Sequence, residues 1–171
     1  MAPLARRLRG MGWQPEALTI YGRAQGIAQS PKLLDDWVAL ARDRLLVNCG
    51  MDSGDPRILR SGVVKSSRIR GPMVDENRRA VEHVRKSGAH LHFSLIFGSP
   101  GETVETCNTN MEFLAWVADT LGQQLDICET DIYWLNFGSP ASKVFHDYSE
   151  AQRLAAMAGK SISKEEWYKS F

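Results

Sequence analysis

The chain alternates between two hydrophobic patterns: short apolar runs, and longer stretches in which apolar residues recur at helical spacing. Glycine-containing turns close the short runs, which is typical of buried strands. The expected strands lie near Leu18–Tyr21, Leu45–Cys49, Leu91–Phe97 and Ile132–Phe137. The expected helices are Leu4–Met11, Ser30–Arg42, Pro56–Arg60, Asp75–Ser87, Val104–Leu121 and Ser149–Ala158, with one more turn at Lys164–Ser170.

This alternation predicts an α/β fold, namely a partial (β/α) barrel of about four parallel strand–helix units. We expect a single domain over residues 1–171, with the barrel core at about residues 13–145 and a helical C-terminal tail. An incomplete barrel leaves two open sheet edges, which are a liability unless another segment covers them. We therefore expect a missing N-terminal half, or a partner chain, to cover a sheet edge.

The sequence also predicts the start of one helix and the buried side of another. Asp75 is expected to cap the helix that runs to Ser87. The helix from Val104 to Leu121 is expected to turn one apolar side inward and to end at Gly122. Its predicted inward residues are Val104, Cys107, Met111, Leu114, Val117, Ala118 and Leu121.

Length and composition are ordinary for a soluble protein, at 171 residues with 43% hydrophobic and 24% charged residues. Lysine and arginine number 21 against 20 acidic residues, so no basic excess indicates a nucleic-acid partner. No run of roughly 18 apolar residues predicts a membrane span, and the Met1–Gly12 segment lacks the apolar core of a secretory signal. We expect a cytoplasmic protein that acts on a small-molecule substrate.

The cysteines give no sign of a metal centre. Cys49, Cys107 and Cys128 lie far apart, and no CxxC or CxxxCxxC motif is present, so each is expected to be a small buried residue in a reducing compartment. His90 and His92 share one face of a predicted strand and could form a metal pair. Because no third ligand is suggested nearby, a structural role is favoured and no metal ligand is predicted.

Polar and glycine residues follow three of the predicted strands. Ligands of α/β folds bind beyond the carboxyl ends of parallel strands. A carboxylate and a hydroxyl beside glycine suit a ribose diol or an amino-acid headgroup. The candidate cofactor-binding residues are therefore Asp52, Ser53, Gly98, Ser99, Pro100, Gly101, Glu102 and Asn136, while no catalytic residue can be assigned.

Other interpretations of these positions stay open. Asp52 could instead be a turn residue that hydrogen-bonds its own backbone. Glu102 could be a first-turn carboxylate stabilised by the helix dipole, which is the favoured reading. The Gly98–Gly101 segment could be no more than a turn between two packed elements.

Several segments resemble those of radical S-adenosylmethionine enzymes. Residues 50–59 are similar to the family's "G-hydrophobic-E/D-S-G … I/V-L" segment, residues 76–89 to "N-x-x-A-V … R-K-A-G", and residues 93–103 to "F-I-x-G-x-P-G-E-T". Residues 21–24 and 31–34 look like the preceding barrel unit, and Gly138–Pro140 sits where members often carry "P-G-T-P". The resemblance covers about residues 13–145 and looks closest to the cobalamin-dependent branch, which includes methyltransferases and a porphyrin cyclase.

The resemblance implies S-adenosylmethionine as the cofactor. It places Asp52 and Ser53 beside the ribose or methionine part, and the turn from Ile96 to Glu102 beside the adenine and methionyl groups. Family members hold a [4Fe–4S] cluster in a CxxxCxxC loop after the first barrel strand, and this loop, the first strands and any cobalamin domain are missing here. Gln25 also stands where relatives often have an acidic residue.

The chain is therefore expected to be either the C-terminal part of a longer methyltransferase-type enzyme or a degenerate remnant. The cluster and cobalamin are expected only in a full-length enzyme, so the isolated chain should be inactive. The alternative function is a non-catalytic α/β binding module or partner subunit.

Overall fold

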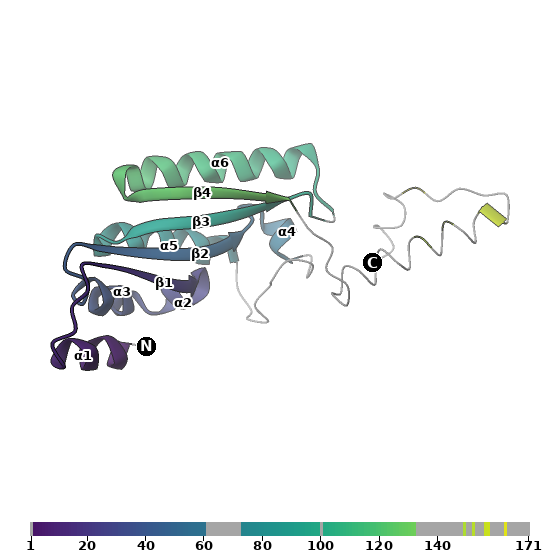
Figure 1. Cartoon of the computed structure of the whole chain (residues 1–171). Coiled ribbons are helices and arrows are strands. Elements are labelled where there is room, and N and C mark those ends of the chain that lie inside the picture. The colour runs from purple at the N-terminus through teal and green to yellow at the C-terminus, as the bar shows by residue number, and fades with distance from the viewer. Residues whose placement is uncertain are drawn as a thin grey trace.

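Four strands lie side by side in one sheet, in the order β1-β2-β3-β4. They are β1 (Ala17–Arg23), β2 (Arg44–Asp52), β3 (His90–Phe97) and β4 (Leu125–Ile132). Each neighbouring pair is parallel, and Figure 1 shows the four arrowheads at the same end of the sheet. The predicted α/β fold with parallel strands is confirmed.

The computed structural model describes residues 2–60, 73–99 and 101–132, together with a few single positions near the C-terminus. The predicted tail helices lie outside this part of the chain, apart from those single positions. The same holds for the predicted Ile132–Phe137 strand beyond Ile132 and for Gly138–Pro140. In the described part, the fourth strand begins earlier than predicted, at Leu125.

The helices form a single layer on one side of the sheet. They are α1 (Ala2–Gly10), α2 (Ala24–Gln29), α3 (Pro31–Val38), α4 (Pro56–Arg60), α5 (Met73–Ser87) and α6 (Val104–Leu121), followed by the 3₁₀ turn η1 (Gly122–Gln124). α5 packs against α2, α3, α4 and α6, while α1 packs on α3. Figure 1 shows α2, α3 and α5 behind the sheet and α6 running along β4. No helix in the described part is long and apolar enough to cross a membrane.

The core lies between this helical layer and the sheet. Along β2 and β3 every second side chain is buried, as the period of a strand requires. Val47 is paired with Leu91 and Cys49 with Phe93, and all four are fully buried. The apolar face of α5, formed by Ala80, Val81 and Val84, is buried in the same core.

The opposite face of the sheet carries partly exposed and mostly polar side chains, including Asn48, His92, Ser94 and Glu129. Within the described residues, no helix covers this face and no further strand pairs with β1 or β4. The expectation that another segment or chain covers an edge stays a prediction.

The predicted inward side of α6 is wrong in part. Its buried residues are Thr106, Asn110, Phe113, Val117 and Leu121. Val104 and Met111 are instead 79% and 54% exposed, and Ala118 is also exposed. The helix is rotated from the expected orientation because a polar pair, Thr106 and Asn110, faces the loops that follow the strands.

Two helix boundaries differ from the prediction, and one helix was not expected. α5 begins at Met73, so Asp75 lies in the first turn and is not the cap. α3 ends at Val38 instead of near Arg42, and the Ser30 side chain makes no capping hydrogen bond. The short helix α2 was not expected, because Gly26 lowers the helix propensity of its segment.

Leu91 offers a test of this packing. Leu91→Ala should lower the free energy of unfolding by about 2–5 kcal/mol, because the side chain is fully buried between β2, β4 and the helices. The exposed Tyr21→Ala on β1 is the control and should change it by no more than about 0.5 kcal/mol. Urea unfolding of both variants measures the difference, and equal effects would contradict the described core.

Candidate functional site

The carboxyl ends of β2 and β3 lie at the same edge of the sheet. Asp52, the last residue of β2, is paired with Leu95 of β3, and Gly98 follows β3 directly. The predicted site residues from these two strands therefore lie at one end, as expected. Pro100 and Asn136 lie outside the described residues.

Asp52 has an unusual backbone. A register shift between Gly50 and Asp52 interrupts the pairing of β2 with β3, and Asp52 has a φ of 60°. Such left-handed backbone is uncommon for a non-glycine residue, although aspartate tolerates it better than most. A Cβ placed on Gly50 would lie 3.7 Å from Asp52 Oδ1 and 3.9 Å from Ser94 Oγ. The glycine thus leaves space beside Asp52, which is 8% exposed as a whole residue.

A buried asparagine ties the two strand ends together. Asn110 of α6 accepts hydrogen bonds at Oδ1 from the Ser53 hydroxyl at 2.8 Å and from the Gly54 N–H at 2.7 Å. Its Nδ2 donates to Glu102 Oε1 at 3.1 Å, and Glu102 Oε2 in turn accepts from the Gly98 N–H. The loop after β2 and the turn after β3 are therefore held to the same helix.

A second asparagine fixes the same loop from the other side. Asn77 of α5 donates from Nδ2 to the carbonyl oxygens of Met51 and Ser53, both at 3.0 Å. The Ser53 hydroxyl also accepts from the Asp55 N–H at 3.0 Å. Ser53 and Glu102 thus have protein partners, and their contact with a cofactor stays a prediction.

The sequence prediction contains neither Asn77 nor Asn110. Both are polar residues within amphipathic helices, where the hydrophobic pattern predicts a solvent-facing position. The sequence holds one signal for each residue. Asn77 lies in a segment that resembles a family pattern. Asn110 stands one helical turn after Thr106, and Thr106 forms the capping box at the start of α6 with Thr103.

The turn after β3 needs its two glycines. Gly98 and Gly101 have φ values of 78° and 85°, a region that glycine enters without strain. The Glu102 N–H closes the turn on the Ser99 carbonyl at 2.9 Å. The hydroxyl of Ser99, one of the predicted site residues, is buried and has no hydrogen-bond partner among the described residues.

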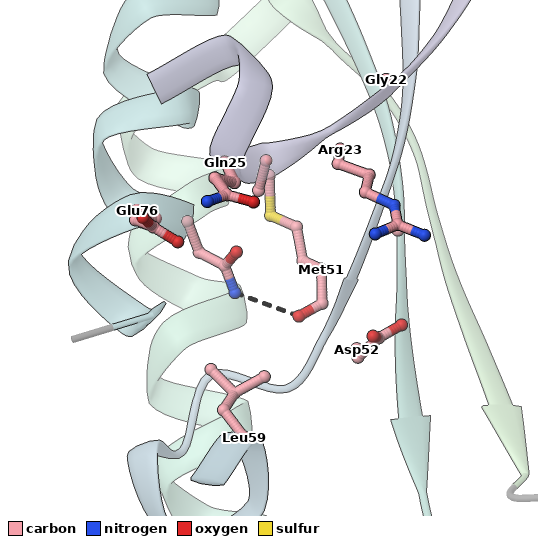
Figure 2. A pocket seen from close by; sticks show the side chains of 10 residues that line it. Gly22, Arg23, Gln25, Met51, Asp52, Leu59 and Glu76 are labelled. Carbon is pink, nitrogen blue, oxygen red and sulfur yellow. Dashed lines mark hydrogen bonds between the residues drawn. The ribbon is translucent and has the colours of Figure 1, made fainter. Parts of the chain in front are cut away.

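A pocket of about 210 Å³ opens between the ends of β1 and β2 and the first turn of α5. Figure 2 shows Arg23 and Asp52 toward one side of the pocket and Gln25 and Glu76 toward the other. The lining residues are Gly22, Arg23, Ala24, Gln25, Gly50, Met51, Asp52, Leu59, Glu76 and Asn77. Of the predicted site residues, Asp52 reaches this pocket.

The three thiols of the described chain have raised pKa values. Burial raises the pKa of Cys49 to about 12, and the nearby Asp52 adds to this rise. Burial and Glu102 raise the pKa of Cys107, while burial and Glu129 raise that of Cys128. None of the three is therefore expected to be a reactive thiolate at neutral pH.

The histidines on the uncovered face form no metal group. His92 Nε2 lies 3.2 Å from Glu129 Oε1. Within the described residues, no three or more His, Cys, Asp or Glu side chains are placed to hold a metal ion.

A partly buried ion pair, between the buried Asp55 and the half-exposed Arg57, lies in the loop after β2. The Asp55 carboxylate accepts from Arg57 Nη2 at 2.8 Å and from the Arg57 backbone N–H at 2.7 Å, and Arg57 Nη1 reaches Glu105 of α6 at 3.1 Å. Burial alone would raise the pKa of Asp55. The hydrogen bonds from Arg57 and Ile58 outweigh that effect and lower the pKa below its usual value.

This lowered pKa predicts a specific pH dependence of stability. A carboxyl group whose pKa is lower in the folded state stabilises the protein above its unfolded pKa of about 3.9, and the contribution is lost as pH falls through the folded pKa. The stability advantage of wild type over Asp55→Asn should therefore shrink as pH is lowered from about 6 to about 3. Urea unfolding at each pH measures it, with the exposed Asp119→Asn as control. A constant advantage would contradict the assigned role of Asp55.

Comparison with known proteins indicates the fold. No protein-family model and no curated protein matches the chain. Among solved structures it is similar to the radical S-adenosylmethionine methyltransferase TsrM from Kitasatospora setae, determined with cobalamin and a [4Fe–4S] cluster bound. The TM-score is 0.57 and the sequence identity 21%, and the match covers 76% of this chain but 23% of that one. The likeness shows that this chain shares the α/β fold of part of that enzyme.

Proposed function

We propose that this chain is part of a radical S-adenosylmethionine enzyme of the methyltransferase type. Its role is to supply four barrel strands and contacts to the cofactor. The observation that carries the proposal is the position of Asp52 at the sheet edge beside the turn after β3, in the two segments that resemble the family. The fold likeness to part of a radical S-adenosylmethionine methyltransferase supports it.

Asp52 is the residue we assign to the cofactor. Its carboxylate can accept hydrogen bonds from two ribose hydroxyls, and the neighbouring Gly50 leaves room for a ligand to approach. The glycines at positions 98 and 101 allow the turn to pack closely against a flat base. Ser53 and Glu102 act by holding this edge in place through Asn110. When bound, S-adenosylmethionine supplies either a methyl group or a 5′-deoxyadenosyl radical.

The described residues do not fit a [4Fe–4S] cluster. Cys49 faces the core, Cys107 lies on α6 and Cys128 on β4, and no group of ligands converges. The proposal therefore assigns the cluster to a further part of the enzyme. We propose that cobalamin, too, binds to that further part of the enzyme.

The further part also has a physical reason to bind here. β1 and β4 have no outer neighbour in the described structure, and the face with Asn48 and His92 is uncovered. Backbone N–H and C=O groups at an open edge pair readily with another strand. We therefore propose that a missing N-terminal half, or a partner chain, completes the barrel at these edges and encloses a small-molecule substrate.

Asp52 provides the first test. In the complete enzyme, Asp52→Ala should weaken S-adenosylmethionine binding by about 1–3 kcal/mol, because a buried hydrogen bond to the ribose is lost. Asp43→Ala is the matched control, since Asp43 is exposed and stands before β2 at the opposite end. Calorimetric titration measures both affinities, and equal affinities for Asp52→Ala and wild type would favour the turn role of Asp52.

Cluster reconstitution provides the second test. The isolated 171-residue chain, treated anaerobically with iron and sulfide, should form no stable cluster and cleave no S-adenosylmethionine, while the complete enzyme should do both. Iron and sulfide analysis and 5′-deoxyadenosine release are the measurements. A stoichiometric cluster on this chain alone would overturn the proposed division of the enzyme. A complete enzyme that forms none would favour a non-catalytic binding module.

A further inference from the structure

The pocket between β1, β2 and α5 contains polar groups that the proposed cofactor contacts do not use. Glu76 lies in the first turn of α5 and is 8% exposed, yet its carboxylate has no hydrogen-bond or ion-pair partner among the described residues. Gln25, on α2, has a buried Nε2 without a partner. Burying such groups without a partner is unfavourable, so both indicate a missing ligand.

The pocket lining combines two carboxylates, those of Glu76 and Asp52, with the neutral Gln25 amide and the Arg23 guanidinium. Glu76 can accept hydrogen bonds from an ammonium group, and the Gln25 amide can donate to an oxygen. Arg23, the exposed last residue of β1, brings a guanidinium, which pairs well with carboxylates. Figure 2 shows Gln25 between Glu76 and Arg23 around the pocket.

The size and the remaining lining limit the ligand further. A volume of about 210 Å³ is smaller than the roughly 300–1,000 Å³ of pockets for drug-sized ligands. Met51 and Leu59 are almost fully buried and give the pocket an apolar wall. A short apolar stem therefore fits beside the charged groups. A whole nucleoside is too large for the pocket, so the nucleoside of the proposed function contacts Asp52 from outside it.

We infer that this pocket binds an α-amino-acid headgroup with an apolar stem, its ammonium on Glu76 and its carboxylate on Gln25 and Arg23. The inference stands on the Glu76, Gln25 and Arg23 pocket and does not rest on the proposed radical chemistry. The headgroup can come from a free amino acid or from the methionyl part of a larger molecule, and both present the same two charges.

L-norleucine, n-pentylamine and hexanoate serve as probes, since the last two each lack one charged group of the first. Calorimetric or ligand-observed NMR titration of the full chain should show saturable binding of L-norleucine. Glu76→Gln should lower the affinity for L-norleucine and for n-pentylamine by about tenfold each, because the ammonium group of each probe loses a charge-assisted hydrogen bond. Arg23→Gln should lower the affinity for L-norleucine and for hexanoate to a similar extent. It should leave the affinity for n-pentylamine unchanged, because this probe has no carboxylate.

Glu82→Gln is the matched control, because Glu82 is an exposed carboxylate on the same helix and lies outside this pocket. It should bind all three probes as wild type does. Circular dichroism checks that each variant is folded, and the exposed Arg23 keeps the test decisive if Glu76→Gln unfolds. Absence of saturable L-norleucine binding, or equal binding by wild type and the folded Glu76→Gln and Arg23→Gln variants, would overturn the inference.

S-adenosylhomocysteine separates the two sources of the headgroup. If it displaces L-norleucine, the pocket holds the methionyl part of the cofactor, and if both bind together, the pocket holds a separate amino acid. Either result agrees with a headgroup site. Failure of S-adenosylhomocysteine to bind the complete enzyme, with L-norleucine binding intact, would count against the proposed function alone.

Discussion

The buried amide of Asn110 is the interaction on which the carboxyl edge of this sheet depends. It accepts from the Ser53 hydroxyl and the Gly54 N–H and donates to Glu102, so one side chain of α6 joins the loop after β2 to the turn after β3. The loop also packs so closely on α6 that a Cβ at Gly54 would overlap the Phe113 side chain. Because Asn110 is fully buried, its hydrogen bonds face little competition from water.

This constraint fixes the positions of the groups at this edge. Ser53 and Glu102 hold the edge through hydrogen bonds to Asn110. Asp52 has a positive φ, lines the pocket and stands two residues after Gly50. The polar uncovered face of the sheet lies next to this edge. A rigid edge that presents one carboxylate beside an open sheet face suits a part of a larger active site better than a complete one.

Three of the four strands were well predicted from the sequence, because buried parallel strands such as Leu91–Phe97 appear as short apolar runs. The fourth strand was predicted near Ile132–Phe137, whereas β4 is observed at Leu125–Ile132. The limits of α6 were equally clear from Thr103 and Gly122. Its buried face was not, because Thr106 and Asn110 are polar and their burial depends on loops distant in the sequence. The pocket was missed for a similar reason: Gln25 and Glu76 lie 51 positions apart in the sequence, and the packing of α2 on α5 brings them together.

The central claim is that Asp52 and the turn after β3 form the cofactor-contacting edge of a larger barrel. A crystal structure of the complete enzyme with S-adenosylmethionine bound tests it most directly. We expect the Asp52 carboxylate within hydrogen-bond distance of a ribose hydroxyl, the turn from Gly98 to Glu102 against the nucleoside, and the Asn110 hydrogen bonds intact. A cofactor bound away from this edge, with Asp52 hydrogen-bonded within its own loop, would contradict it.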